Sequence, residues 1–228
     1  MPKARKSIED YINYLKSQPN GFLYNDDNHQ EGKPVNKQQE LDDIKKKFAD
    51  CSRCPLATQG RNQVVFGIGN PNAEIMFIGE GPGRDEDLKG EPFVGRAGKL
   101  LTKIIEAMGL TREEVYISNT VKCRPPNNRT PLPSESDTCI NHILMKEISI
   151  IKPKVICALG ATAAQALLGP DTRLSDVRGS FLPVGKSKLL VTYHPAYLLR
   201  NPPAKKFVWE DMLKILSLLG KKPPQRQP

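Results

Sequence analysis

Short apolar runs alternate along most of the chain with segments in which apolar residues recur at helical spacing. The apolar runs are residues 73–78, 115–118, 155–159 and 189–193, and the helical segments are residues 98–108, 134–150, 162–168 and 207–219. Ser134 is the expected N-cap of the second helix, and Gly160 opens the third. Uninterrupted apolar runs that alternate with helices indicate a parallel sheet with right-handed crossovers. We therefore predict an α/β fold, a three-layer α/β/α sandwich around a central four-stranded parallel sheet.

The two ends of the chain lack this alternation. The first forty residues are mostly polar, with one helical pattern around residues 8–15 and a second around residues 37–49. The last eight residues are rich in Pro, Lys and Gln and are expected to be disordered. We therefore predict a polar extension at residues 1–47, one folded domain at 48–220 and a basic tail at 221–228.

The composition restricts the cellular location expected for the protein and the class of partner that it could bind. No apolar run approaches the ~20 residues of a membrane span, and the first ten residues have no apolar core of the kind found in a secretory signal. We expect a cytoplasmic protein that does not bind membranes. The formal net charge of +9 is compatible with a polyanionic partner but does not identify one.

Unusual residues follow each predicted strand. The first strand leads into Gly79-Glu80-Gly81-Pro82-Gly83, where three glycines allow a sharp turn and close approach to a ligand. Asn119 follows the second strand, Gly160 the third and His194 the fourth, while Phe93 comes shortly after the glycine loop. Ligands bind outside the carboxyl ends of parallel strands. The sequence therefore predicts one crevice with an acid, an aromatic, an amide and an imidazole.

Each of these residues also has a purely structural interpretation. Asn119 could form a turn, Phe93 could fill the core, and His194 could support the turn at Pro195. Glu80 has the weakest structural explanation, because a carboxylate beside a tight turn gains little from that position. Their shared location favours a functional site.

The cysteines separate into two groups. Cys157 lies in a predicted buried strand and reads as a small core residue. The other four lie in polar, loop-like segments, at Cys51, Cys54, Cys123 and Cys139. Without a secretory signal, a metal or cluster site is favoured over disulfides. Four thiolates can hold zinc or an iron–sulfur cluster, but a zinc ribbon would normally supply a second C-x2-C pair, which Cys123 and Cys139 do not form.

Three blocks of the sequence resemble the family 4 uracil-DNA glycosylases. They are Gly79 to Asp87, Gly90 to Gly98, and Asn119 followed by His194 to Pro202, in the order of the family. The resemblance covers roughly residues 48–220 and implies the uracil-DNA glycosylase fold. It implies an enzyme that hydrolyses the N-glycosidic bond of deoxyuridine in single- or double-stranded DNA and leaves an abasic site and free uracil. We expect a monofunctional monomer without lyase activity.

The same resemblance implies roles for the crevice residues. Uracil would be flipped into the pocket and stacked on Phe93, beside the backbone of Gly79 and Gly81. Asn119 would pair with uracil N3–H and O4, and His194 would donate to O2 and stabilise the charge on the departing base. Glu86, near the C5 edge, would leave no room for the methyl group of thymine.

The remaining implied roles concern the sugar, the DNA and the cluster. The related family 1 enzymes have an aspartate where this chain has Gly81, so Glu80 would position water or shield the positive sugar. Leu198 and Leu199 would form a wedge in the duplex, and Arg200 would contact phosphate. Further phosphate contacts are expected from Lys205, Lys206, Arg124 and Arg129. The four cysteines would hold a [4Fe–4S] cluster, as they match the family's spacing.

Two alternatives compete with a glycosylase. A relative that traps uracil-DNA covalently depends on an inserted basic loop with a histidine, and Asp87-Leu88-Lys89-Gly90 contains neither. A nucleotide-binding module could use Gly79 to Gly83 as a phosphate loop, but the Gly-Lys-Ser/Thr ending is absent.

Overall fold

The structure is a computed structural model that describes residues 36–224. The helical pattern predicted at residues 8–15 and the end of the predicted tail lie outside the described residues. Within them, six strands form one sheet in the order β1-β3-β2-β4-β6-β5. The strands are β1 (Ile68–Gly69), β2 (Ile75–Gly79), β3 (Tyr116–Asn119), β4 (Val155–Leu159), β5 (Phe181–Val184) and β6 (Ser187–Thr192).

The four inner strands, β3, β2, β4 and β6, are parallel, which confirms the predicted central sheet. Both edge strands were missed, and both are antiparallel to their neighbours. β1 has only two residues, too few to leave a periodic pattern. β5 contains Pro183, which is tolerated because an edge strand leaves one row of N–H groups unpaired.

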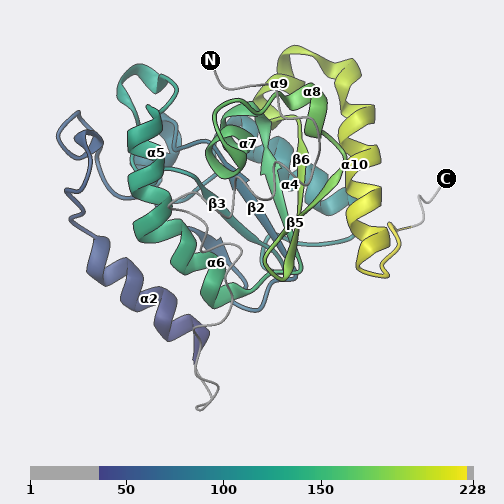
Figure 1. The fold of residues 1–228 in the computed structure, drawn as a ribbon, viewed down its shortest axis with the longest axis horizontal. Coiled ribbons are helices and arrows are strands. Elements are labelled where there is room, and N and C mark those ends of the chain that lie inside the picture. Colours follow the sequence, from purple (N-terminus) through teal and green to yellow (C-terminus); the bar gives the residue numbers. More distant parts are fainter. Residues whose placement is uncertain (1–35, 225–228) are drawn as a thin grey trace.

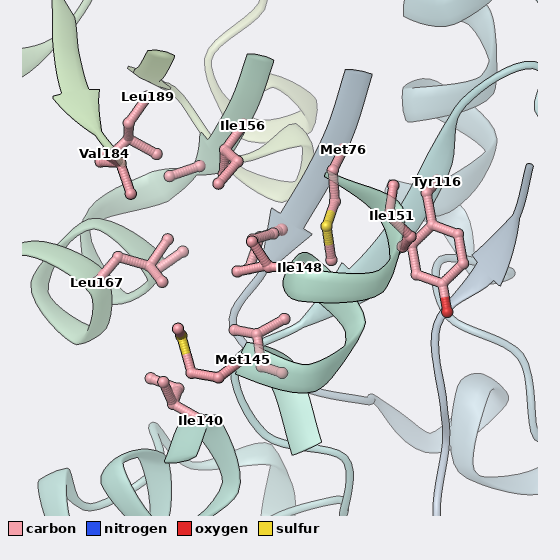
Figure 2. Close-up of a cluster of buried hydrophobic side chains, with 14 of the residues drawn as sticks. Met76, Tyr116, Ile140, Met145, Ile148, Ile151, Ile156, Leu167, Val184 and Leu189 are labelled. Carbon is pink, nitrogen blue, oxygen red and sulfur yellow. The ribbon is translucent and has the colours of Figure 1, made fainter. Parts of the chain in front are cut away.

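Helices cover both faces of the sheet, as predicted (Figure 1). One face packs against α2 (Lys37–Phe48), α6 (Met145–Ile151), α7 (Gly160–Leu168) and α8 (Leu174–Val177). The other packs against α4 (Arg96–Ala107), α9 (Pro195–Arg200) and α10 (Lys205–Leu218). Figure 2 shows the first of these cores, where Met76 and Ile156 of the sheet meet Ile148 of α6 and Leu167 of α7. None of the described helices is long and apolar enough to cross a membrane.

The helix α2 corrects the predicted domain boundary. Its residues Leu41, Ile44 and Phe48 are buried, as the helical pattern predicted. The Lys37 ammonium donates a hydrogen bond to the carbonyl of Ile151 at the end of α6, beside which α2 lies (Figure 1). The folded body therefore includes this helix and does not begin at residue 48.

The helix predicted at residues 134–150 is interrupted. It consists of α5 (Pro133–Cys139), a π-helical turn η4 (Ile140–Leu144) and α6. Ser134 is not the N-cap: Pro133 occupies the first turn, and the Glu135 carboxylate accepts a hydrogen bond from the backbone N–H of Leu132, 2.8 Å away. The π-helical turn begins directly after Cys139, and such turns occur frequently at functional sites.

Short helical segments complete the chain and lie in the loops around the carboxyl ends of the strands. They are η2 (Pro55–Ala57), α3 (Arg84–Lys89), η3 (Pro126–Asn128) and η5 (Pro202–Ala204). No helix was predicted at residues 84–87, which are four consecutive charged residues. The structure places them in α3, whose Asp87 is fully buried and accepts hydrogen bonds from the backbone and side chain of Asn62.

Candidate functional site

The ends of β2 and β3 bring Gly79 and Asn119 together. The two residues are partners in the parallel ladder between these strands. A methyl group added to Gly79 would lie 2.5 Å from the Asn119 Oδ1 atom and 2.5 Å from the Cζ atom of Phe93. Glycine is required at this position for space, because an amide side chain and an aromatic ring meet above its backbone.

Asn119 carries an open hydrogen-bond acceptor. The residue is 2% exposed, yet its Oδ1 atom is the buried side-chain oxygen without a hydrogen-bond partner among the described residues. Its backbone carbonyl, in contrast, accepts from the Lys122 ammonium at 2.9 Å, and that ammonium pairs with Glu147 at 2.7 Å. A buried polar atom without a partner is costly and requires an explanation, so Oδ1 marks a site for an external donor.

Phe93 lies beside Asn119 in an unusual backbone conformation. Its φ angle is 56°, in the left-handed region that is rare for a bulky residue, and its side chain is almost buried. The ring centroid lies 5.7 Å from that of His194. Such outliers concentrate at functional sites, where the surrounding structure holds them in place.

Glu86 is one of the groups that hold this loop. Its carboxylate accepts hydrogen bonds from the backbone N–H groups of Val94 (2.9 Å), Gly95 (2.8 Å) and Gly83 (3.1 Å). The sequence reading placed Glu86 at the edge of the substrate only. The structure adds a second task, which is to join the glycine loop to the Phe93 loop.

His194 caps α9 with its own ring. Its Nδ1 atom accepts a hydrogen bond from the backbone N–H of Ala196 at 3.1 Å, so the neutral ring carries its proton on Nε2. Burial lowers the pKa of His194 to about 4, and the positive charge of Arg200 adds to this effect. With this pKa the ring is neutral at pH 7. Gly160 lies against the same residue, because a methyl group at Gly160 would lie 2.9 Å from the His194 Cβ atom.

Glu80 and Gly81 form the remaining part of the glycine loop. Burial raises the pKa of the half-buried Glu80, while a hydrogen bond with Thr162 of α7 opposes this change. A methyl group on Gly81 would lie 2.6 Å from Val121, so the loop packs directly on the segment that follows β3. The structure thus pairs the ends of β2 and β3 at Gly79 and Asn119 and brings Gly160 after β4 next to His194 after β6, with the Phe93 ring close to both pairs.

The residues expected to contact DNA are only partly available. Leu198 is 1% exposed and belongs to the core between α4 and α10, so it cannot act as half of a wedge in this structure. Leu199 is 39% exposed, and Arg200 is also exposed. Arg129 donates to the carboxylate of the buried Glu135 at 2.7 Å and is therefore already paired.

Four cysteines line one pocket. Cys51 and Cys54 precede η2, Cys123 follows β3 and Cys139 ends α5. All are free thiols, and no group of three His, Cys, Asp or Glu side chains in residues 36–224 could hold a single metal ion. Burial raises the pKa of Cys139 to about 12.

Two hydrogen bonds reach the sulfur atoms of this pocket. The Arg61 guanidinium donates to Cys123 at 2.7 Å, and the Lys122 backbone N–H donates to Cys139 at 3.2 Å. Lys122 thus touches both sites, through its side chain at Asn119 and its backbone at Cys139. The sequence analysis did not identify it, although its place three residues after Asn119 and directly before Cys123 was a signal.

A parallel sheet with buried polar and aromatic side chains at its carboxyl edge is typical of enzymes of the open α/β class. Residues 66–213 match the family model described as the uracil DNA glycosylase superfamily. A type-4 uracil-DNA glycosylase from Archaeoglobus fulgidus is 46% identical over 192 residues, which cover 81% of this chain and 96% of that protein. One from Thermotoga maritima is 47% identical over 182 residues, which cover 78% and 94%.

A third relative of the same name, from Saccharolobus solfataricus, is 45% identical over 192 residues, which cover 80% of this chain and 88% of that protein. The chain belongs to the uracil-DNA glycosylase superfamily and, within it, to the type-4 enzymes. The resemblance inferred from the sequence blocks is confirmed.

Proposed function

We propose that this type-4 uracil-DNA glycosylase is a monofunctional hydrolase that acts on a uracil flipped out of DNA, leaving an abasic site and free uracil. The observation that carries this proposal is the unpartnered Oδ1 atom of Asn119, which lies beside Gly79 and the Phe93 ring. A flat base with a donor at its edge would pair with this atom beside the Phe93 ring. A base within the duplex could not reach them, so flipping is required.

Asn119 accounts for the choice of uracil over cytosine. Its Oδ1 atom would accept from uracil N3–H, and its Nδ2 group would donate to O4. Cytosine has no hydrogen on N3 and presents an amino group in place of O4, so both contacts would fail. Mismatched buried polar groups are a strong source of discrimination.

Phe93 and Glu86 would define the other edges of the slot. The Phe93 ring would stack on the base, next to Gly79 and Gly81, which carry no side chain. Glu86 would lie near the C5 edge. Because three backbone N–H groups hold its carboxylate, it cannot move aside easily to admit the methyl group of thymine.

His194 would stabilise the leaving group. A neutral imidazole whose Nδ1 accepts from Ala196 presents an Nε2–H donor, which would bond to uracil O2. As the N-glycosidic bond breaks, electrons move onto the base, and a donor preset at O2 is strongest in that state. Glu80, when ionised, would orient the attacking water or shield the positive charge on the sugar.

We infer that Cys51, Cys54, Cys123 and Cys139 hold a [4Fe–4S] cluster. The four thiols surround one pocket and do not converge on one point, which fits a cubane, where each thiolate binds its own iron. N–H groups from Arg61 and Lys122 would bond to two of the ligating sulfurs. The cluster would tie the N-terminal segment and the 123–139 loop to the sheet.

This role of the cluster predicts an effect on stability. Cys51→Ala is expected to lose the brown colour of the purified protein and about 3 kcal/mol or more of stability. Base selectivity should not change. Cys157→Ala, which alters a buried cysteine away from the pocket, is the matched control for colour. A brown Cys51→Ala protein would contradict the ligand assignment.

DNA would be held by exposed residues around the crevice. Leu199 would enter the duplex beside the flipped base, and Arg200 would contact phosphate, with support from Lys205 and Lys206. We propose that the enzyme works as a monomer.

The test is incubation with a uracil-containing oligonucleotide followed by alkali. Alkali-labile breaks at the uracil position are the expected result, whereas the same oligonucleotide with cytosine or thymine should stay intact. Breaks before alkali treatment would reveal lyase activity and contradict a monofunctional enzyme. A denaturant-resistant protein–DNA band would indicate covalent trapping instead.

A further inference from the structure

The backbone of Phe93 is held in its unusual conformation from outside its own loop. Residues other than glycine rarely adopt a φ of 56°, and the cost is of order 1–3 kcal/mol. The two torsions of Phe93 are set by the peptide planes on either side of it. Those planes end in the carbonyl of Pro92 before it and the carbonyl of Phe93 after it.

Arg112 binds both of these carbonyls. Its Nη2 atom donates to the Pro92 carbonyl at 3.0 Å, and its Nη1 atom donates to the Phe93 carbonyl at 3.3 Å. Nη1 also donates to the Thr102 hydroxyl of α4 at 3.2 Å. The planar fork of a guanidinium can span two carbonyls in this way, which a lysine ammonium cannot do with the same geometry.

The same peptide plane is gripped from its other side. The N–H of Val94 belongs to the plane that carries the Phe93 carbonyl, and it donates to the Glu86 carboxylate. A methyl group on Gly98 of α4 would lie 1.8 Å from the Phe93 carbonyl oxygen, so the helix backbone also presses on this plane. The Arg112 guanidinium, the Glu86 carboxylate and the α4 backbone at Gly98 therefore together fix the peptide unit that follows Phe93.

We propose that Arg112 is a positioning residue for base binding: it holds both peptide planes of Phe93, so that the ring stays over the slot. The inference rests on the proposed stacking role of Phe93. Without Arg112, Phe93 returns to a negative φ and its ring leaves the position beside Asn119 and His194. Loss of Arg112 therefore weakens the binding of uracil and leaves the proposed role of His194 in the reaction unchanged.

The experiment measures inhibition by free uracil and kcat/KM on a single-stranded uracil oligonucleotide. Arg112→Gln is expected to weaken both by about ten- to a hundredfold, the range that corresponds to the strain of such a backbone. Arg112→Lys should lose less, because it keeps the charge and can reach one carbonyl. Thr102→Val, which removes the third partner and leaves both carbonyl contacts, is the matched control and should change neither value more than about twofold.

A double-mutant cycle separates positioning from general structural support. Glycine adopts a φ of 56° freely and has no ring to aim, so in a Phe93→Gly background the Arg112 substitutions should cost almost nothing further. An equal loss in both backgrounds, or no loss in the native background, would overturn the inference. Thermal unfolding of each variant identifies any that is not folded, and Arg112→Lys then carries the cycle.

The two possible failures are distinguishable. If Phe93→Gly leaves uracil inhibition unchanged, the proposed stacking role is wrong and the inference falls with it. If Phe93→Gly weakens inhibition but neither Arg112 variant does, only the inference on Arg112 is wrong.

Discussion

The two halves of the crevice are positioned by different means. Asn119 and Gly79 end strands and are paired in the sheet, and the Asn119 carbonyl accepts from Lys122 of the buried Lys122–Glu147 ion pair. Phe93 and His194 lie outside the strands, and each depends on a few polar contacts: Arg112 holds the Phe93 backbone from a separate segment, and His194 accepts from its own turn. The strand half takes its position from the whole fold, while the loop half can change without altering the core. We therefore expect a substitution in the strand half either to abolish its contribution to activity or to leave it unchanged. Substitutions around the loop half should instead reduce activity in graded steps.

Removing the amide from the strand half should have the largest effect. Asn119→Ala would lose the two hydrogen bonds proposed to the base, and kcat/KM is expected to fall about 10²–10³-fold. Stability should stay the same or rise slightly, because the substitution also removes a buried acceptor that has no partner. Single-turnover kinetics and thermal unfolding measure the two effects. Asn141→Ala, on the exposed surface of η4, is the control.

A clear loss of stability in Asn119→Ala would reverse this view of the strand half. It would show that the amide supports the fold, and that the open acceptor is filled in the free protein.

The imidazole of the loop half should show its effect through pH. His194→Ala is expected to reduce kcat by about 10²–10³-fold. In the native enzyme the pKa of about 4 keeps the ring neutral, so the single-turnover rate should be level through pH 6.5 and fall only as pH approaches 4. A pH–rate profile with an inflection near 6.5 would contradict the buried, neutral ring.

The same residue links pH to stability. The pKa of His194 is 6.5 when exposed and about 4 when folded, so the unfolded chain binds the proton first. The contribution of the neutral ring is therefore complete above pH 6.5 and is lost as pH falls towards 4, by up to about 3 kcal/mol. Denaturant unfolding of the native enzyme and His194→Asn across this range measures it, because the asparagine variant should lack this dependence.

Glu86 should give an intermediate effect that separates its two tasks. Glu86→Ala removes the link to Val94, Gly95 and Gly83, and activity on uracil should fall about tenfold as the Phe93 loop relaxes. If its carboxylate also fills the C5 edge, the variant should begin to excise thymine. Glu86→Gln, which keeps the size, should still refuse thymine. Continued refusal of thymine by Glu86→Ala would leave Glu86 with the loop-holding task alone.

The smallest effect is expected at the rim. Leu199→Ala should lower activity on duplex DNA a few-fold without changing stability, because the side chain is exposed in the free protein. Leu198→Ala should instead cost about 2–4 kcal/mol, as other core truncations do, with little direct effect on duplex activity. A comparison of single- and double-stranded substrates with urea unfolding distinguishes the neighbours.

The strand half could be predicted from the sequence, and the supports of the loop half could not. Four apolar runs identify the inner strands, and the residue after each run marks the crevice, so Asn119 and His194 follow from local pattern. The groups that hold Phe93 come from Glu86 and Arg112 on separate segments. The pattern of apolar and polar residues does not indicate which charged side chain will bind which backbone group.

The same reason explains the errors. Leu198 and Leu199 are adjacent residues of the same type, and only the packing of α9 against α4 decides which one is buried. Ser134 is a good capping residue by type, but Pro133 and Glu135 already satisfy the start of α5. The helix α2 was predicted, whereas its place in the core depends on contacts with α6, more than a hundred residues away.

Gly79 has a consequence for how activity could be switched off while the protein stays intact. It is absent from the positive-φ positions, so its backbone tolerates a side chain and the obstacle is steric. An alanine at this position would place its methyl group 2.5 Å from the Asn119 oxygen and from the Phe93 ring, in the space proposed above for the edge of the substrate. We expect the Gly79→Ala protein still to fold and still to bind DNA, while the methyl group permanently blocks the proposed uracil site.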